Sequence, residues 1–405
     1  MNPNTIRWLD RNIGRPVCFL LTLQRKISSF FKSKKPYLQK CDKILFIKLI
    51  EQGSTVLAYP ALKKAAGLVG QDNIYFMVFK ENRPILDILD IVPQNNIFEI
   101  DSRNIFTLIF SLFKVLRRLY KEKIDAVIDM EFFSRGSAII SYLAGAKTRV
   151  GLHQFTCEGP YRGDLFTHKL IYNPYLHTKV FFASLVEALN HIPKQNNGLM
   201  IFEVPEIKEE LPLFLPEPQE REALRKKVEG IKQASLTKPV IILNPSVSDI
   251  LPIRRWPEEH FIELGRIILR GFPQATIIIT GTSKEKEKAE AIVSKIGNAV
   301  SLAGHTSIRE LLTLYSIADI LVTNDSGPAH FSALTSIKSI ILFGPETPLL
   351  YGELSKNIKN ITPDLICSPC INVYNFRESP CHSRICLKNI SPAKVLEKIK
   401  DAVTS

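Results

Sequence analysis

Residues 318–330 read ADILVTNDSGPAH, a short apolar run that passes directly into a polar loop. A continuous apolar run of this length is typical of a strand buried on both faces of a parallel sheet. Gly327 and Pro328 mark the loop and the start of a helix, because proline fits the first helical turn. The stretch therefore predicts one strand–loop–helix unit with polar side chains at the strand's carboxyl end.

The same alternation of apolar runs and amphipathic stretches extends through both halves of the chain. In the second half, strands are expected at PVIILN (239–244), ATIIIT (275–280), ADILVT (318–323) and KSIILFG (338–344), and helices near 257–270, 284–296, 307–317 and 327–336. In the first half, strands are expected at 44–48, 73–79, 97–100 and 124–130, and helices at 55–68, 83–91 and 105–121. This alternation predicts the α/β class, with two Rossmann-like doubly wound domains.

The chain of 405 residues is long enough for two hydrophobic cores. A charged stretch with four prolines, 205–238, reads as a linker followed by a helix at about 219–229. The expected divisions are an N-terminal segment 1–43, a domain 44–204, this linker, and a domain 239–405. A hydrophobic share of 45% and a charged share of 23% exclude a disordered or fibrous chain.

The net charge of +13 is concentrated at the N-terminus, where residues 1–43 hold ten basic and two acidic side chains. Its apolar run 17–23 is too short to span a bilayer and lacks a signal-peptide cleavage site. The segment is instead amphipathic, with the apolar residues Ile6, Trp8, Leu9, Val17, Phe19, Leu20, Leu23, Ile27, Phe30 and Phe31. It predicts contact with an anionic membrane surface, the alternative being a leader packed on its own domain. No motif indicates a nucleic-acid partner.

The seven cysteines do not form a secreted disulfide pattern, since their number is odd and Cys18, Cys41 and Cys157 are scattered. A reducing cytoplasm fits this usage. The other four, Cys367, Cys370, Cys381 and Cys386, lie in the tail beside His382. Four thiols can form a tetrahedral zinc site, and the alternative is a set of reduced thiols packing a loop-rich segment.

Three strand-end loops of the second half carry candidate binding residues. The first, Asp325, Ser326, Gly327 and His330, opens a helix whose free N–H groups could bind a phosphate, with Asp325 or Ser326 as the cap; the alternative is a purely structural helix start. The second holds Ser246, Arg254 and Arg255, and two guanidinium groups beside a strand end would suit a diphosphate, the alternative being a solvated surface pair. The third, ITGTS with Glu285, could contact a nucleoside, the alternative being a plain strand–turn–helix with a charged first turn. The P-loop, GxGxxG, HExxH, GxSxG and DxD patterns are absent.

In the first half, Glu51-Gln52-Gly53-Ser54-Thr55 follows the first strand. Gly53 suits a tight turn, and a helix is expected to start at Thr55. Glu51 at this strand end could act as a general base, the alternative being a solvated turn glutamate.

Taken together, these stretches resemble glycosyltransferase family 9, the ADP-heptose:lipopolysaccharide heptosyltransferase group, over roughly residues 44–402. The resemblance is carried by ILFIKLIEQGSTVLAYPALKKA (44–65), NPS with RRWPEEHF (244–261), LAGHTSIRELLTLYSIADILVTNDSGPAHFSAL (302–334), ILFGPETPLLYG (341–352) and the CSPC…ISPAKVLEKI tail. It implies a GT-B fold of two Rossmann-like domains facing across a cleft, with the acceptor on the N-terminal domain and the nucleotide-sugar donor on the C-terminal one. It also implies inverting transfer without an obligatory metal cofactor.

Matched position by position, the resemblance assigns Asp325, Ser326, Gly327 and His330 to the donor motif. It assigns Arg254, with Arg255 beside it, to the donor phosphates, Ser246 to the neighbouring loop and Glu285 to the nucleoside. The chain departs from the family at Ser54, where members carry the aspartate proposed as the catalytic base. A serine hydroxyl cannot accept a proton near neutral pH as a carboxylate does.

Three outcomes follow from the departure at Ser54: Glu51 takes over as base, another carboxylate such as Asp129 or Glu131 does, or the site is inactive. The expected function is transfer of a heptose or related sugar from a nucleotide-diphosphate donor to a lipid-linked glycan. It is expected at the cytoplasmic face of the membrane, as a peripheral enzyme. The alternatives are a different donor and acceptor, or an inactive nucleotide-sugar-binding scaffold.

Overall fold

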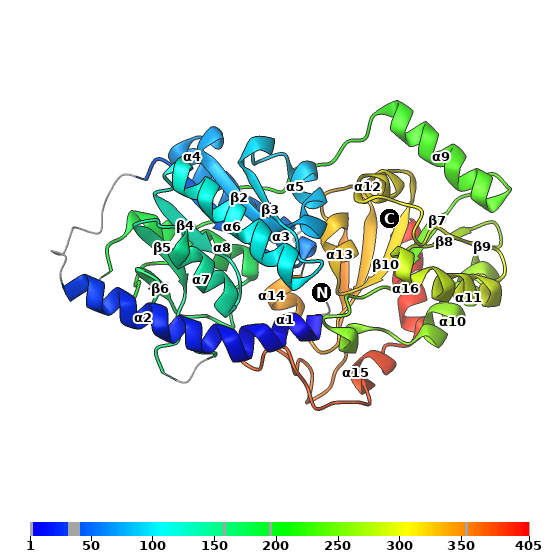
Figure 1. Cartoon of the computed structure of the whole chain (residues 1–405). Helices are drawn as coiled ribbons and strands as arrows, with labels where there is room; N and C mark the ends of the chain where they lie inside the picture. Colours follow the sequence, from blue (N-terminus) through cyan, green and yellow to red (C-terminus); the bar gives the residue numbers. More distant parts are fainter. Residues whose placement is uncertain (1–2, 31–40, 157–158, 194–196, 353–354, 405) are drawn as a thin grey trace. The chain divides into compact units, whose positions relative to one another are not determined.

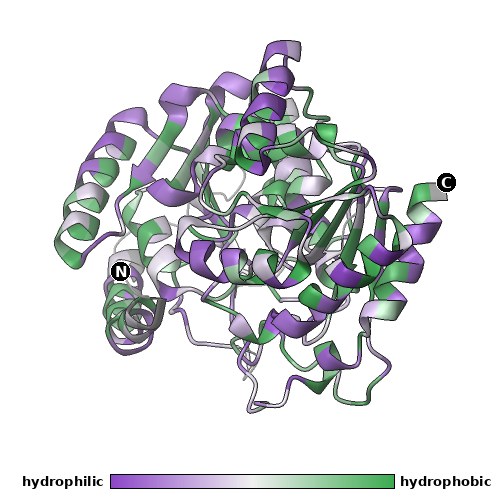
Figure 2. Ribbon diagram, turned by 90° about the vertical axis from the view of Figure 1, so that its right-hand side faces the viewer, coloured by the Kyte–Doolittle hydropathy of each residue, from purple (hydrophilic) through white to green (hydrophobic). Residues whose placement is uncertain are grey.

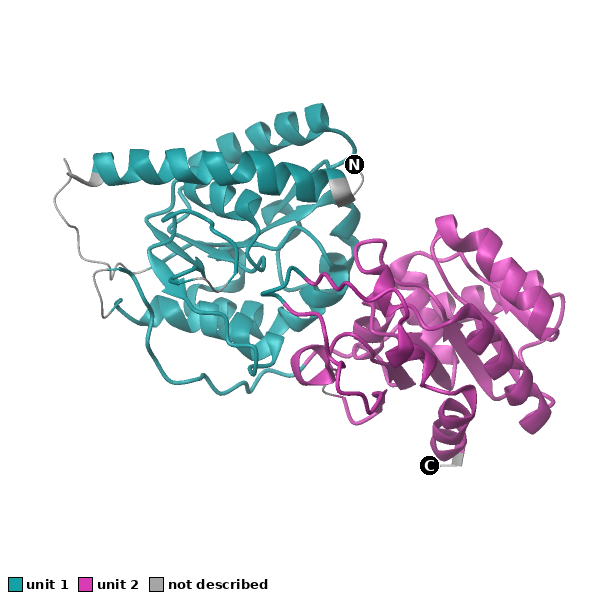
Figure 3. Cartoon of the chain, turned by 90° about the horizontal axis from the view of Figure 1, so that it is seen from below, with its two compact units in different colours: residues 1–210, 373–376 teal, residues 211–372, 377–405 magenta. Residues whose placement is uncertain are grey.

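The computed structural model describes residues 3–30, 41–156, 159–193, 197–352 and 355–404, and divides into two compact units. Unit 1 comprises Met1–Glu210 and Val373–Phe376, and unit 2 comprises Leu211–Asn372 and Arg377–Ser405 (Figure 3). Each unit contains one six-stranded sheet. In the described part of the chain, no helix combines the length and apolar character needed to cross a bilayer.

The sheet of unit 1 is parallel throughout, in the order β3-β2-β1-β4-β5-β6. Its strands are β1 (Ile44–Ile47), β2 (Ile74–Phe79), β3 (Ile97–Ile100), β4 (Ala126–Asp129), β5 (Thr148–Leu152) and β6 (His168–Leu170). Ile47 at the end of β1 lies opposite Asp129 at the end of β4. This order is that of a doubly wound sheet, so the α/β class predicted from the sequence is confirmed.

The helices that connect these strands are α3 (Gln52–Leu57), α4 (Tyr59–Val69), α5 (Pro84–Leu89), α6 (Ile105–Glu122), α7 (Arg135–Leu143) and α8 (Thr178–Glu187). The prediction of a single helix over 55–68 is wrong, because the chain forms two helices there. Pro60 has no N–H to continue the first helix and lies instead in the first turn of α4.

The N-terminal segment packs on unit 1 as α1 (Pro3–Leu9), a π-helical turn (Asp10–Gly14) and α2 (Arg15–Phe30). Cys18 of α2 is buried in one cluster with Ala138 of α7, and Asp10 pairs with Arg135 at 3.1 Å. Val115 of α6 and Ile140 of α7 share a second cluster with the sheet. The helices α6, α7 and α2 therefore follow one another on the same face of the sheet (Figure 1). The predicted basic and apolar residues Phe31, Lys32, Lys34, Lys35 and Lys40 lie outside the described residues.

The sheet of unit 2 is also parallel, in the order β12-β11-β10-β7-β8-β9. Its strands are β7 (Val240–Asn244), β8 (Thr276–Ile279), β9 (Ala299–Ser301), β10 (Ile320–Asn324), β11 (Lys338–Leu342) and β12 (Ile358–Ile361). Its helices are α9 (Pro218–Lys232), α10 (Glu258–Gly271), α11 (Lys286–Ile296), α12 (Ile308–Ile317), α13 (Gly327–Ser332), α14 (Pro348–Tyr351), α15 (Ile385–Lys388) and α16 (Pro392–Thr404). Counted from its first strand, unit 2 repeats the topology of unit 1, with β7 and β10 in the places of β1 and β4.

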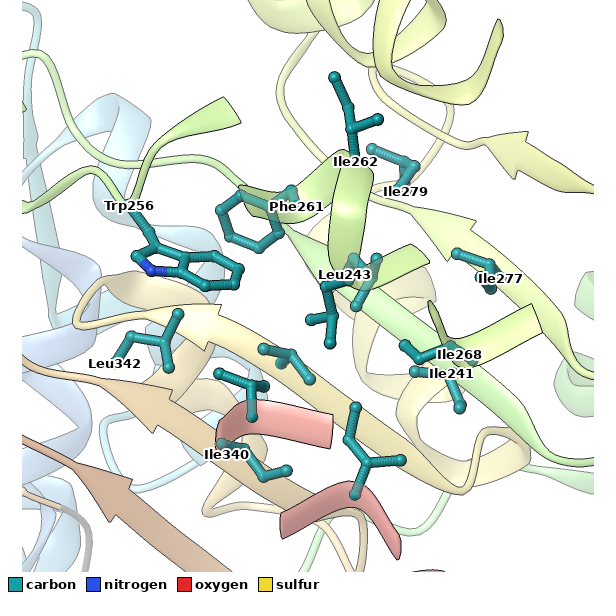
Figure 4. Packing of buried hydrophobic residues seen from close by; sticks show 14 of the residues in the cluster. Ile241, Leu243, Trp256, Phe261, Ile262, Ile268, Ile277, Ile279, Ile340 and Leu342 are labelled. Atoms are coloured by element: carbon teal, nitrogen blue, oxygen red, sulfur yellow. The ribbon is translucent and has the colours of Figure 1, made fainter. Parts of the chain in front are cut away.

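The core of unit 2 lies between its strands and α10, α11 and α16. Trp256 is buried with Leu243, Phe261 and Leu342 (Figure 4), and its indole N–H donates to the carbonyl of Ile390 at 2.9 Å. That hydrogen bond satisfies the polar atom of a large buried side chain. Figure 2, coloured by hydropathy, shows green strands in this unit between helices that carry both green and purple.

Candidate functional site

The strand order places the candidate residues at a defined point of each sheet. In unit 1 the order reverses between β1 and β4, and in unit 2 between β7 and β10. Ligands of doubly wound sheets bind beyond the carboxyl ends of the strands at such a reversal. Glu51 and Glu131 follow β1 and β4, and Ser246 and Asp325 follow β7 and β10. The predicted residues thus gather at the expected edge within each unit.

Arg254 is held by two buried carboxylates at the carboxyl edge of unit 2. Its Nη1 lies 3.2 Å from Oδ2 of Asp325 and 3.3 Å from Oε2 of Glu346. Arg377 reaches the other oxygen of Glu346, with its Nε at 3.3 Å from Oε1. Sequence reasoning identified Arg254 and Asp325 but missed Glu346 and Arg377. Glu346 follows β11 in the stretch GPET, so its strand-end position was the available signal.

Asn324 ties the loops of this edge together, and it too was missed. Its Oδ1 accepts a hydrogen bond from the main-chain N–H of Trp256 at 2.9 Å, and its Nδ2 donates to the carbonyl of Pro245 at 3.1 Å. The side chain is fully buried. Asn324 therefore fixes the loop after β10 to both ends of the segment 245–256, beside Arg254.

In the loop 325–330, the prediction that Asp325 or Ser326 caps the following helix is wrong. Ser326 is the N-cap residue of α13 but makes no side-chain cap, because its hydroxyl donates to the carbonyl of Asn324 at 3.2 Å. Asp325 does not replace it as the cap, since its carboxylate engages Arg254. The helix ends at Ser332 rather than at 336, while Pro328 occupies its first turn as predicted. His330 and Ser326 are buried beside Asp325 in the chain.

Ser246 and Glu285 meet in a second group. The Ser246 hydroxyl donates to Oε2 of Glu285 at 2.7 Å, and the N–H and hydroxyl of Thr282 donate to the same oxygen at 2.9 and 2.8 Å. Glu285 thus completes a capping box at the start of its helix.

Arg255 is half-buried, and across the described ranges no hydrogen bond or ion pair of its guanidinium is recorded. Arg254 and Arg255 are therefore held differently, although they are neighbours.

In unit 1, Lys48 and Glu131 fix the turn after β1. The buried Lys48 ammonium donates to the carbonyl of Ile50 at 2.6 Å and lies 3.4 Å from Glu131. Oε1 of Glu131 accepts hydrogen bonds from the N–H groups of Leu49 and Ile50 at 2.6 and 3.1 Å. Burial raises the pKa of the Glu131 carboxyl, and the Lys48 charge acts in the opposite direction. Glu131 is therefore engaged in holding the backbone.

The turn itself differs from the prediction. Its left-handed residue is Glu51, with φ of 66°, and not Gly53, which lies inside α3. The helix begins at Gln52 rather than at Thr55. Ser54 is buried, and its hydroxyl donates to the carbonyl of Glu51 at 2.9 Å. The Ser54 hydroxyl therefore donates its hydrogen to a main-chain carbonyl oxygen, and not to a basic side chain that could take up the proton.

The three candidate bases differ in their exposure. The Glu51 side chain is 20% exposed and lies 3.9 Å from the Lys48 ammonium, whereas Glu131 is 7% exposed. Asp129 is fully buried, pairs with Arg162 and accepts a hydrogen bond from Ser137 at 2.8 Å. Of the three carboxylates, Glu51 is the one most accessible to a substrate.

Unit 1 also contains a basic pocket of about 350 Å³ beneath α2, with Arg25, Lys26 and Lys169 among its lining residues. Asp164 in its wall pairs with both Arg25 and Lys169. Burial lowers the pKa of Lys169, and the charges of Arg25 and Lys26 lower it further, whereas Asp164 opposes both. The N-terminal segment therefore supplies part of the positive charge of this pocket.

The four tail cysteines are close enough to interact electrostatically. Burial raises the pKa of Cys386, and Cys370, Cys381 and Cys367 act in the same direction. Across the residues that the structure describes, however, no group of three or more potential ligands is arranged to hold a metal ion. The zinc site stays a prediction.

Two parallel sheets of the same strand order, each with polar residues at its reversal point, define the two-domain GT-B class. The model of glycosyltransferase family 9 (heptosyltransferase) matches residues 112–378, and the chain belongs to this family. The resemblance recognised in the sequence and the predicted fold class are thereby confirmed.

Named relatives agree with this assignment. The chain is 31% identical over 176 residues to a lipooligosaccharide heptosyltransferase 2 of Campylobacter jejuni, covering 41% of this chain and 52% of that protein. The chain thus spans about half the length of that curated relative. The structure of Escherichia coli ADP-heptose LPS heptosyltransferase II matches with a TM-score of 0.67 at 20% identity, covering 89% of this chain and 98% of that one. E. coli heptosyltransferase WaaC with ADP matches with a TM-score of 0.62 at 16% identity, covering 89% and 99%. These two likenesses concern the fold.

Proposed function

We propose that this protein is an inverting glycosyltransferase that transfers a heptose or related sugar from a nucleotide-diphosphate donor. ADP-heptose is the first donor to test, and the acceptor is the lipopolysaccharide core or another lipid-linked glycan. The observation that carries the proposal is Arg254, held by Asp325 and Glu346 at the reversal point of unit 2 in a member of family 9. The names of the relatives support the choice of sugar and acceptor.

In the proposed reaction, unit 2 binds the donor. Asp325 and Glu346 both contact Nη1 of Arg254, and a guanidinium group, which carries five N–H donors in one plane, is well suited to bind a diphosphate. Ser326, Gly327 and His330 would lie along the same phosphates, and Ser246 and Glu285 would contact the nucleoside. A preorganised cation stabilises the charge that develops on the leaving diphosphate.

Unit 1 supplies the acceptor side. The acceptor hydroxyl attacks the anomeric carbon, the bond from that carbon to the diphosphate oxygen breaks, and the hydroxyl proton passes to a carboxylate. We assign this role to Glu51, since Ser54 is not a base and Asp129 and Glu131 are engaged elsewhere. This chain would thus place its base three residues before the position that the family uses.

We also propose that the protein works as a peripheral enzyme at the cytoplasmic face of an anionic membrane. The outer side of α2 exposes Phe19, Leu20, Leu23 and Ile27, and Arg15 lies on the same helix. Apolar and basic groups on one helix suit the interface of an anionic bilayer.

The zinc proposal rests on the proximity of Cys367, Cys370 and Cys381 to Cys386. Elemental analysis of the purified protein tests it, with the double variant Cys367→Ser/Cys370→Ser as the comparison. One equivalent of zinc in the wild type, lost in the variant, supports it. Metal-free wild-type protein refutes it.

Transfer of radiolabelled heptose from ADP-heptose to a panel of lipopolysaccharide-core acceptors tests the main proposal. Labelled acceptor formed by the wild type and reduced in Arg254→Ala supports it. Donor binding by calorimetry without transfer to any acceptor would favour the inactive scaffold instead. Absence of binding to any nucleotide-sugar would refute both.

A further inference from the structure

The outer face of α6 carries a stripe of exposed apolar side chains. The exposed fractions are 81% for Phe106, 59% for Ile109, 73% for Phe110, 66% for Phe113 and 73% for Tyr120. Their spacing of three, four and seven residues places them on one side of the helix. On the opposite side, Val115 and Leu119 are buried in the core of unit 1. A helix that is apolar on its outer side as well as its inner side marks an interaction surface.

Positive charge lies beside this stripe. Lys114, Arg117 and Lys121 are exposed on α6, and within the described ranges no ion pair of theirs is recorded. The acidic residue of the helix, Glu122, is turned to the sheet, where it lies 3.4 Å from Lys43 and 3.1 Å from the Tyr75 hydroxyl. The outer face of α6 therefore carries apolar side chains, and the charged side chains beside them are all basic.

The neighbouring helix α2 has a similar outer side. It lies on the other flank of α7, on the same face of the sheet (Figure 1). Its exposed side chains include Phe19, Leu20 and Leu23. One helix layer of unit 1 thus presents two apolar surfaces with basic residues. A partner with a flat anionic surface and an apolar layer beneath it would be complementary to both of these surfaces.

We propose that the α6 stripe, defined as Phe106, Ile109, Phe110, Phe113 and Tyr120 with Lys114, Arg117 and Lys121, inserts into the surface of an anionic membrane. The aromatic rings would reach the boundary between headgroups and acyl chains, and the three cations would contact lipid phosphates. A second copy of the chain is a poor occupant, because a two-fold pair would bring the same cations of both copies together. The proposal makes α6 a membrane contact of its own, in addition to the N-terminal segment.

Sedimentation of the full chain with vesicles tests the proposal and needs neither donor nor acceptor, so its outcome is independent of the transferase activity. The vesicles are phosphatidylcholine alone or phosphatidylcholine mixed with the anionic lipid phosphatidylglycerol, since basic surfaces bind anionic lipid. We expect the triple variant Phe106→Ser/Phe110→Ser/Phe113→Ser to lower the partition coefficient on anionic vesicles at least about tenfold. We expect Lys114→Ala/Arg117→Ala/Lys121→Ala to lower it by up to about 100-fold at low salt, at roughly fivefold for each cation.

Matched controls come from exposed residues of unit 2. Leu213→Ser/Leu215→Ser/Ile366→Ser removes as many exposed apolar side chains, and Arg270→Ala/Lys288→Ala/Lys295→Ala removes the same charges. Both controls should bind within about twofold of the wild type if α6 is responsible. The single variant Phe110→Asp repeats the test with the least change to the fold, and thermal unfolding of every variant verifies that the fold is kept.

The proposal is overturned if the wild type does not bind anionic vesicles, or if the α6 variants bind as the wild type does. It is also overturned if the controls lose binding equally. Analytical ultracentrifugation tests whether a second copy of the chain covers the stripe instead. A wild-type dimer that becomes monomeric in the variant Phe106→Ser/Phe110→Ser/Phe113→Ser, with vesicle binding unchanged, would identify a second copy as the occupant.

Discussion

Arg254 Nη1 lies 3.2 Å from Oδ2 of Asp325, although 71 residues separate them in the chain. Asp325 is buried, and the Arg254 side chain is 11% exposed. The pair joins the two loops that leave β7 and β10, at the point where the strand order reverses. Within unit 2, it is the relationship on which the proposed donor site depends.

Replacement of Arg254 should weaken the donor site and the fold together. Hydrogen bonds to charged groups contribute about 1.5–3 kcal/mol, so we expect Arg254→Ala to raise the Kd for ADP-heptose roughly 10- to 100-fold. It should also lower the Tm, because Asp325 and Glu346 lose a buried partner. Calorimetry and thermal unfolding measure the two effects. Arg254→Lys keeps the charge and should recover part of the stability but little of the affinity.

Arg255→Ala is the matched control, because it removes a neighbouring guanidinium without a recorded partner in the described structure. A small change in Tm is expected. If its effect on donor affinity equals that of Arg254→Ala, both arginines contact the diphosphate. If Arg254→Ala binds the donor normally, the assignment of Arg254 is wrong.

Glu51→Gln should slow transfer greatly, whereas Ser54→Ala should keep it. The glutamine has the shape of the carboxylate but cannot accept a proton, and general-base catalysis typically contributes 10²–10⁴-fold. We expect kcat to fall by about that factor while the Kd for the donor stays within about twofold. Ser54→Ala loses one hydrogen bond to the Glu51 carbonyl and should cost about 1 kcal/mol of stability. Steady-state kinetics of both variants decide between the two positions, and full activity of Glu51→Gln removes it as the base.

Gly163→Ala should loosen α2 from unit 1. Gly163 has φ of +70°, and a Cβ there would lie 2.6 Å from the Thr22 hydroxyl and 2.7 Å from the Cys18 carbonyl. The strained backbone at residue 163 and the clash with Thr22 and Cys18 should both weaken the packing of α2 on unit 1. Burial raises the pKa of Cys18 to about 11, so its thiol should react slowly with iodoacetamide in the wild type and faster in the variant. Peptide mass spectrometry measures the rate, and the exposed Cys367 should label equally in both proteins.

Acid should destabilise unit 1 through His168. Burial lowers the pKa of His168 to about 4, from the ordinary value of 6.5. The unfolded chain therefore binds the proton first as the pH falls, and the free energy of unfolding decreases from about pH 6.5 towards pH 4, by on the order of 3 kcal/mol for this group. Denaturant unfolding at pH 7.5 and 4.5 measures the loss.

His168→Gln should show a smaller loss of stability over the same pH interval, because the glutamine does not titrate. His305→Gln, at an exposed histidine, should behave as the wild type does. An equal loss in His168→Gln and the wild type would contradict the assignment.

The differences between expectation and structure have specific causes. The helix expected over 55–68 divides because Pro60 suits the first turn of a helix and not its interior. The left-handed residue of the first turn is Glu51, a position at which glycine is the usual choice, so the nearby Gly53 was the misleading signal. Glu346 and Asn324 stand at strand ends, as many structural residues do, and only the structure shows that they contact Arg254 and Trp256.

The sequence by itself determined the parallel α/β class, the two domains, the family, and the strand-end positions of Arg254, Asp325, Ser246 and Glu51. It could do so because apolar periodicity and turn residues are local properties of the chain. Only the tertiary structure decided that Arg254 lies between Asp325 and Glu346, that Ser54 is turned to a main-chain oxygen, and that α6 is apolar on the outside. These relationships depend on which distant segments the sheets bring together and which side of a helix they bury, and neither follows from local sequence.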